Sequence, residues 1–258
     1  MSFLIIELTS RGLIFGADKN VTSTYPDGSK SQNEKTEKVL KWPNEKAMIG
    51  FVGQGIIGEL STKDWIEKFI NENATFSSLE EISSKLKDEV EKQRRVDEGV
   101  ENPVALIIHL GGFETSDDIP IPKIYLITNV WGLNQDGSYN DFRKEFKSTE
   151  ELWKYFPYVT HASDLRGVVA EKENNLEPFW FHQGFDLLTF NALHASLKLA
   201  FKSLIQHHPK HKLPKTLDEW EKHAKMQILM YGSYFESFHQ SDELYVGGGA
   251  DILSIEWK

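Results

Sequence analysis

The chain has 258 residues, of which 40% are hydrophobic and 12% aromatic, and its formal net charge is −10. A chain of this size can bury a sizeable core, whereas a nucleic-acid-binding surface would have to be assembled against the overall negative field. The sequence has no cysteine, which excludes disulfides, thiolate catalysis and cysteine-based zinc sites, and no apolar run reaches the ~18 residues of a membrane span.

We therefore expect one domain over residues 1–258, with no cofactor or metal and with neither nucleic acid nor membrane as a partner. The N-terminus lacks the basic start and the small-residue cleavage site of a signal peptide, so a cytoplasmic protein is expected.

The N-terminal part is predicted to form strands and then helices. Residues 3–8 and 13–18 are apolar runs around the turn at Arg11-Gly12, which is typical of a hairpin. A loop or distorted ribbon follows, rich in charge and turn formers, and "KVLKWPNEKAMIGFVGQG" predicts a second hairpin. Apolar residues near helical spacing predict helices over 59–72 and 78–96.

The C-terminal part alternates between strands and helices. "PVALIIHLGGF" and "KIYLITNVWGL" predict two strands, "STEELWKYF" predicts a capped short helix at 148–156, and the rest of 134–178 gives mixed signals. Helices are predicted over 185–206 and 216–238, and "LYVGGGADILSIEW" is expected to close the chain as a strand with a glycine interruption.

The order of these elements predicts the fold class. Four strands, two helices, two strands, two helices and a last strand favour an α+β fold, a four-layer αββα sandwich of two antiparallel sheets flanked by helices. Neither half has a complete set of layers by itself, which indicates a single domain.

The first residues also suggest chemistry. A serine at the N-terminus is a nucleophile with its own base, because its free α-amino group has an ordinary pKa of ~7.7–8.0. This scheme needs removal of Met1 to expose Ser2, since an amide nitrogen is no base. A cation beside the hydroxyl favours its ionised form and a carboxylate holds that cation, and Lys38 and Asp18 are the candidates. "GFVGQG" offers backbone N–H donors for an oxyanion.

Each of these signals alone has an ordinary explanation. A serine at position 2 is common, an aspartate that closes a strand is usually a turn former, and a lysine in a charged loop is usually solvated. His109 lies in an apolar strand, so a core histidine is a better interpretation than a base. The joint arrangement of Ser2, Asp18 and Lys38 is the stronger evidence.

Residues 2–72 resemble the proteasome β-subunit branch of the N-terminal nucleophile (Ntn) hydrolases. "SFLIIELTSRGLIFGADKNVT" is similar to that family's opening hairpin, the hairpin "KVLKWPNEKAMIGFVGQG" to the one that carries its catalytic lysine, and the likeness resumes near "LYVGGGADILSI". The resemblance implies the Ntn hydrolase fold. It also implies the following roles: Ser2 as nucleophile, Asp18 as the carboxylate beside the lysine, Lys38 as that lysine, Gly53 as oxyanion donor, Thr22 as a ligand of the substrate backbone and Phe51 in the substrate side-chain pocket.

The sequence also departs from that family. The family's nucleophile is usually threonine, and serine lacks the methyl group that fixes the rotamer. The spacing from Asp18 to Lys38 is longer than usual, and the family's late serine and aspartate have no clean counterpart here.

Three functions remain open at this point. The first is an amide-bond hydrolase, a proteasome-like peptidase that uses Ser2 on a peptide or other amide substrate and forms a homo-oligomer. The second is a catalytically silent, ring-forming or scaffold subunit, and the third is a small-molecule amidase on the same fold. The first is favoured, because a silent subunit has no reason to keep Asp18, Lys38 and Gly53 in register with an N-terminal serine.

Overall fold

The computed structural model describes residues 3–24, 30–96, 105–133, 139–184, 187–208, 210–238 and 248–258. Its first sheet has four antiparallel strands, all paired in the order β12-β1-β2-β13. These strands are β1 (Phe3–Thr9), β2 (Gly12–Asp18), β12 (Phe179–Gly184) and β13 (Ala250–Glu256). The predicted N-terminal hairpin is thus confirmed, and it forms the centre of this sheet.

The second sheet has five antiparallel strands in the order β11-β10-β9-β6-β5. They are β5 (Val39–Lys41), β6 (Ala47–Gly53), β9 (Leu106–Ser116), β10 (Ile119–Leu133) and β11 (Tyr139–Glu150). Two small ribbons stand apart from both sheets: β3 (Asn20–Thr24) with β4 (Lys30–Lys35), and β7 (Ile56–Ile57) with β8 (Leu60–Ser61).

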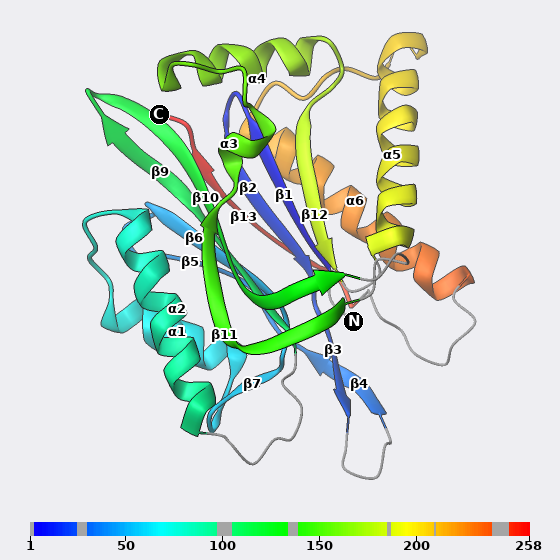
Figure 1. Ribbon diagram of the computed structural model, residues 1–258. Coiled ribbons are helices and arrows are strands. Elements are labelled where there is room, and N and C mark those ends of the chain that lie inside the picture. The colour runs from blue at the N-terminus through cyan, green and yellow to red at the C-terminus, as the bar shows by residue number, and fades with distance from the viewer. Residues whose placement is uncertain are drawn as a thin grey trace.

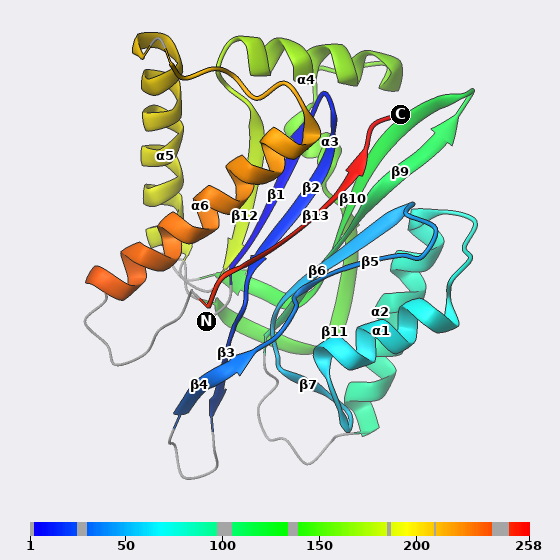
Figure 2. The ribbon, with the colours of Figure 1, turned by 180° about the vertical axis from the view of Figure 1, so that it is seen from behind.

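Helices cover the outer face of each sheet (Figures 1 and 2). The second sheet is covered by α1 (Thr62–Glu72) and α2 (Leu79–Val96), and the first by α5 (Leu187–His207) and α6 (Leu217–Phe238). The short α3 (Leu152–Tyr155), a 3-10 turn (Ala162–Asp164) and α4 (Leu165–Asn174) lie between β11 and β12 in the chain. The predicted α+β sandwich with two antiparallel sheets between helices is confirmed.

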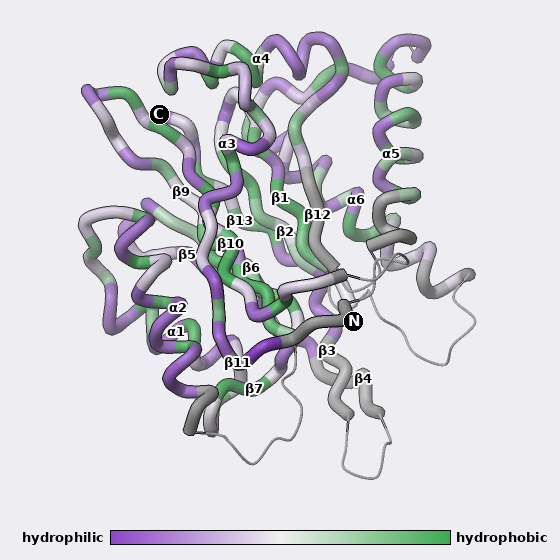
Figure 3. The backbone as a smooth tube through the Cα atoms, in the orientation of Figure 1, coloured by the Kyte–Doolittle hydropathy of each residue, from purple (hydrophilic) through white to green (hydrophobic). Residues whose placement is uncertain are grey.

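The alternation of side chains along β1 explains the layers. Leu4, Ile6 and Leu8 pack into the core between the two sheets, whereas Phe3 and Ile5 pack against α6 on the other face. Successive side chains of a strand point to opposite faces, so a strand buried on both faces must be apolar at every position but a few. Figure 3 shows β1 and β2 as hydrophobic over most of their length. Full burial of one such side chain contributes about 1.5–3 kcal/mol.

The segment from 134 to 178 differs most from the prediction. Residues 148–150 end strand β11, so the helix expected over 148–156 is wrong there and spans only residues 152–155 as α3. The strand β11 is at the edge of its sheet and carries many charged residues, which is how natural proteins protect an exposed edge. That polar character hides the strand from an analysis that looks for apolar runs.

Within the described residues, no helix is long and apolar enough to cross a membrane, and no group of three or more histidine, aspartate or glutamate side chains could hold a metal ion.

His109 is buried in the middle of the second sheet. It lies on β9, opposite Gly50 of β6 and Leu126 of β10, and is 2% exposed. Burial lowers the pKa of its imidazole from 6.5 to about 3. The unfolded chain therefore takes up a proton as the pH falls through the ordinary value, whereas the folded chain does not until the pH is far lower. The free energy of unfolding should therefore decrease progressively as the pH falls from about 6.5 towards about 3.

We expect His109→Gln to reduce this acid sensitivity. Between about pH 7 and about pH 4.5, the free energy of unfolding of the unmodified chain should fall by about 2 to 3 kcal/mol more than that of the variant. Urea denaturation at the two pH values measures the difference, with His161→Gln at an exposed position as the control. An equal acid-induced loss in the unmodified chain and in His109→Gln would show that His109 is not the group that titrates.

Candidate functional site

A buried carboxylate lies where β2 ends and β1 begins. Asp18 is fully buried at the end of β2, and its Oδ1 atom accepts a hydrogen bond of 2.7 Å from the backbone N–H of Phe3. Phe3 is the first described residue and the first residue of β1. The side chain of Asp18 thus holds the beginning of the chain in place.

Lys38 forms an ion pair with this carboxylate. Its side chain is 3% exposed, and Nζ lies 3.0 Å from Oδ1 of Asp18. Nζ also donates to the backbone carbonyl of Asn20. The backbone of Lys38 is fixed in turn, because its carbonyl accepts the N–H of Phe51 from the adjacent strand β6 at 3.0 Å. Strand β6 therefore sets where the lysine enters the site.

Asp251 is a site residue that the sequence analysis missed. It lies on β13, where it pairs with Ala17, the neighbour of Asp18. Its Oδ2 atom accepts the backbone N–H of Lys38 at 3.2 Å, and its Oδ1 atom forms a 2.5 Å ion pair with Lys19. The sequence signal was present, since an aspartate follows the glycines at the start of the last strand, but only the antiparallel register of β13 with β2 brings it to Lys38.

Burial dominates the electrostatics of the pair. It raises the pKa of Asp18, although the charge of Lys38 and the N–H of Phe3 oppose this change. Burial also lowers the pKa of Lys38, against the charge of Asp18. Taking a charge out of water is costly, and the attraction between the two charges offsets part of that cost. The lysine is therefore more readily deprotonated than a solvated one.

Gly53 closes strand β6 in a conformation suited to glycine. Its φ angle is +111°, and a Cβ atom there would lie 2.1 Å from the carbonyl oxygen of Ala105. Both the backbone angle and the close approach exclude a larger residue without a shift of the chain. This is the glycine that the sequence analysis assigned as oxyanion donor, and that role stays a prediction.

The other predicted site residues are placed less completely. Ser2 lies outside the described residues. Thr22 falls on β3, but its side chain lies outside the described part. Phe51 is 5% exposed and packs in the core between the second sheet and the helices α1 and α2. The structure thus brings Asp18 and Lys38 together, whereas the substrate-binding roles of Thr22 and Phe51 remain untested.

Lys38 and Asp18 have hydrogen-bonding groups beyond those that they use with each other. An ammonium group has three N–H donors, and in the described residues Asp18 and the carbonyl of Asn20 take two of them. The second carboxylate oxygen of Asp18, Oδ2, is buried and has no hydrogen-bond partner in the described part of the chain. A buried donor and a buried acceptor therefore lie together at the start of β1.

Among known proteins, similarity to this chain was found in structure. No model of a protein family matches the chain, and no curated protein matches it. Anbu (ancestral beta-subunit) from Yersinia bercovieri is similar in structure, with a TM-score of 0.50 and 14% identity over 98% of this chain and 82% of that one. A mutant of Anbu from Hyphomicrobium sp. strain MC1 has 14% identity over 99% of this chain and 82% of its own, with a TM-score of 0.49. Anbu from the same strain has 15% identity, covers 98% and 82%, and has a TM-score of 0.43.

These findings correct the assignment made from the sequence. In fold the chain resembles Anbu from Yersinia bercovieri, so the assignment to the proteasome β-subunit branch is wrong. The motifs that suggested it are two hairpins, and the structure contains both, as β1 with β2 and β5 with β6. They identify a kind of fold, and they do not separate families that share it.

We expect Lys38→Met to destabilise the chain by about 3 kcal/mol or more, because it leaves the carboxylate of Asp18 buried without its partner. The double variant Asp18→Asn with Lys38→Met should lose less than the sum of the two single changes. Lys63→Met, in the more exposed pair with Glu67, is the control and should lose at most about 1 kcal/mol. Urea denaturation gives the free energies. Strict additivity of the two single changes would show that the pair does not interact.

Proposed function

We propose that this chain is an amide-bond hydrolase that acts on peptides and uses Ser2 as its nucleophile after removal of Met1. The observation that carries the proposal is the hydrogen bond from Phe3 to Asp18, together with the ion pair of Asp18 with Lys38. Ser2 is covalently joined to Phe3, so this hydrogen bond tethers the residue next to Ser2 directly to the buried pair.

The proposed reaction needs one residue to act in two ways. The α-amino group of Ser2 takes the proton of its own hydroxyl while Oγ bonds to the carbonyl carbon of the substrate amide. The tetrahedral oxyanion then collapses, the C–N bond breaks, and the α-amino group delivers the proton to the leaving amine. Water, activated by the same amine, hydrolyses the resulting ester and restores the serine.

The neighbouring residues support this reaction. The positive charge of Lys38 favours ionisation of the Ser2 hydroxyl and keeps the α-amino group neutral, because like charges repel. Asp18 orients the lysine, and Asp251 fixes the backbone of the lysine through its N–H. Gly53 is proposed as the oxyanion donor, with Thr22 and Phe51 as substrate ligands. Residues 1–258 are proposed to form one domain, because the strands of the first sheet come from both ends of the chain.

Ser2→Ala and a variant that retains Met1 should both abolish hydrolysis, for different reasons. The first removes the hydroxyl, and the second converts the base into an amide. Intact-mass measurement reports removal of Met1, release of a dye from peptide substrates reports activity, and a covalent hydroxyl-directed inhibitor should label only the unmodified chain.

The outcomes discriminate between the functions. Equal hydrolysis by the unmodified chain and by Ser2→Ala would show that another residue is the nucleophile. An unlabelled, inactive chain with a confirmed Ser2 terminus would support the silent-subunit alternative. Lys92→Gln, at an exposed position on α2, is the control for nonspecific effects of substitution.

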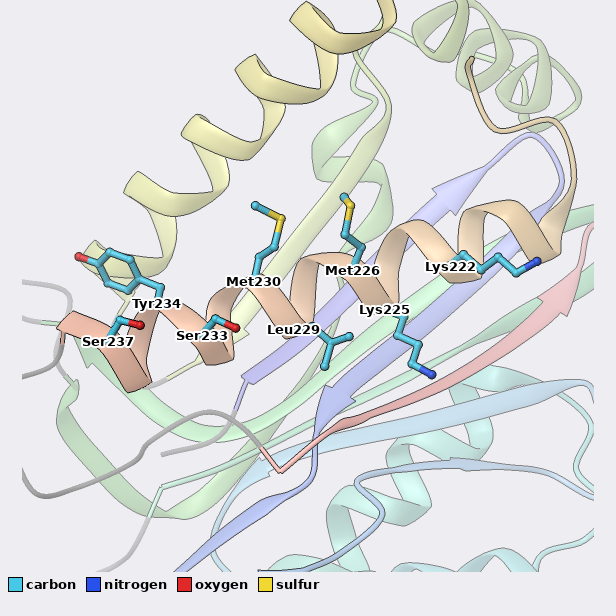
Figure 4. A pocket seen from close by; sticks show the side chains of 8 residues that line it. All are labelled: Lys222, Lys225, Met226, Leu229, Met230, Ser233, Tyr234 and Ser237. Carbon is cyan, nitrogen blue, oxygen red and sulfur yellow. The ribbon is translucent and has the colours of Figure 1, made fainter. Parts of the chain in front are cut away.

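We also propose that the chain associates with copies of itself, as the word "subunit" in the description of Anbu suggests for that protein. The aromatic residues of α1 are not available for this, because Phe69 is 4% exposed and stacks with the partly buried Trp65. A group of exposed apolar side chains lies on α6 and lines a hollow of about 610 Å³ (Figure 4). They are Met226, Leu229, Met230 and Tyr234, which are 37% to 46% exposed.

Replacing two of these side chains should dissociate the assembly. Met226→Glu with Met230→Glu puts charges where a second copy would bury apolar surface, so sedimentation velocity should give a smaller species than for the unmodified chain. Ile56→Glu, at an exposed apolar position beside α1, is the matched control. An unmodified chain that stays monomeric at high micromolar concentration would overturn this proposal.

A further inference from the structure

A second, basic pocket lies between α4, the start of β12 and α5. Its volume is about 380 Å³, within the range of about 300–1,000 Å³ that is typical of small-molecule sites. Lys172, Lys198 and Lys202 line it, with Glu177 as the one acidic residue among its lining residues. In a chain with a net charge of −10, a local excess of positive charge is unexpected.

Among the residues that line the pocket, a single carboxylate faces the three lysines. Lys202 pairs with Glu177 at 3.6 Å, and that carboxylate is 65% exposed. Lys198 and Lys172 instead lie over aromatic rings, 5.3 Å from the ring centre of Trp180 and 5.8 Å from that of Tyr158. Burial and the charge of Lys172 lower the pKa of Lys198. The ammonium groups repel one another, and an anion between them would relieve this repulsion.

The backbone at the pocket is held in an unusual conformation. The helix α4 ends in a Schellman motif, in which the N–H of Glu177 bonds to the carbonyl of Lys172 and the N–H of Leu176 to that of Glu173. Leu176 has φ +58° at the position where glycine is usual. A leucine here carries a conformational cost, and its side chain lines the pocket.

The remaining walls are apolar. Phe179 is the first residue of β12 and Pro178 directly precedes it, while Leu199, which is 70% exposed, comes from α5. The pocket thus combines a cluster of cations with apolar walls. A ligand that satisfies both has an anionic head group and a short apolar body.

We propose that this pocket binds a small amphiphilic anion, a carboxylate or a phosphate monoester on a short apolar chain, with Lys172 and Lys198 at the head group and Leu176 against the body. The site is separate from the buried pair at Asp18. Phe179 pairs with Leu8 at one end of β1, whereas Phe3 lies at the other end of that strand. Figure 1 shows α4 at the end of the sandwich remote from the N-terminus. The proposal does not rest on the proposed hydrolase activity.

Isothermal titration calorimetry of the full chain tests it, with octanoate and octyl phosphate as probes. Octylamine is the cationic probe with the same body, and inorganic phosphate is the head group alone. Lys198→Gln and Lys172→Gln should each weaken binding of the octyl anions about tenfold, the effect of losing a charge-assisted contact. Lys92→Gln, an exposed lysine on α2, should leave the affinity within about twofold.

The variant Leu176→Gly distinguishes an effect on ligand binding from an effect on the stability of the fold. The change relieves the left-handed leucine, so the melting temperature should be kept or raised, while octanoate binding should weaken about fivefold because an apolar wall is lost. This variant makes the test independent of any damage caused by replacing a partly buried lysine.

The titrations with the four probes decide whether the pocket binds an amphiphilic anion. Binding of octanoate or octyl phosphate that falls in the lysine variants supports the site, and the tighter of the two identifies a carboxylate or a phosphate source. Octylamine that binds as tightly as octanoate, inorganic phosphate that binds as tightly as octyl phosphate, or no binding by either octyl anion would overturn the proposal.

Discussion

The buried ion pair of Asp18 with Lys38, which also binds the backbone of Phe3, can form only if several distant strands are correctly paired. Removing two charges from water costs several kcal/mol per ion, and only good geometry with further hydrogen bonds repays that cost. Here the N–H of Phe3 bonds to Asp18, and the carbonyl of Asn20 accepts from Lys38. Asp251 holds the backbone of Lys38 from the last strand. The first strand, the second hairpin and the last strand must therefore all be in register for the pair to form.

The sandwich supplies that register. Strands β1 and β2 are buried on both faces, between the second sheet and α6, so a slip of one residue would move every apolar side chain to the wrong layer. β13 joins β2 from the far end of the sequence and delivers Asp251 beside Asp18. The same first sheet extends through β12 to the basic pocket, so the buried pair and that pocket lie at opposite ends of one sheet.

The sequence predicted correctly those elements whose signal lies within a short stretch of the chain. The hairpin of residues 3–18 and the helices α1, α2, α5 and α6 follow from apolar periodicity and turn residues, and with them the sandwich. Asp18 and Lys38 could be paired because a cation near a nucleophile needs a carboxylate. Strand β11 could not be found this way, because an edge strand is charged, and Asp251 could not, because its place depends on pairing between the two ends of the chain. The family assignment failed because hairpin motifs describe the shared fold.

The central claim is that Lys38 is a buried lysine with a lowered pKa, which the proposed function assigns to the activation of Ser2. The most direct measurement is NMR titration of the lysine side chains in the chain with Met1 removed, before and after covalent modification of Ser2. The account predicts that the pKa of Lys38 lies below the ordinary value of a lysine and changes when Ser2 is modified. A Lys38 that titrates as a solvated lysine, with no response to modification of Ser2, would contradict it.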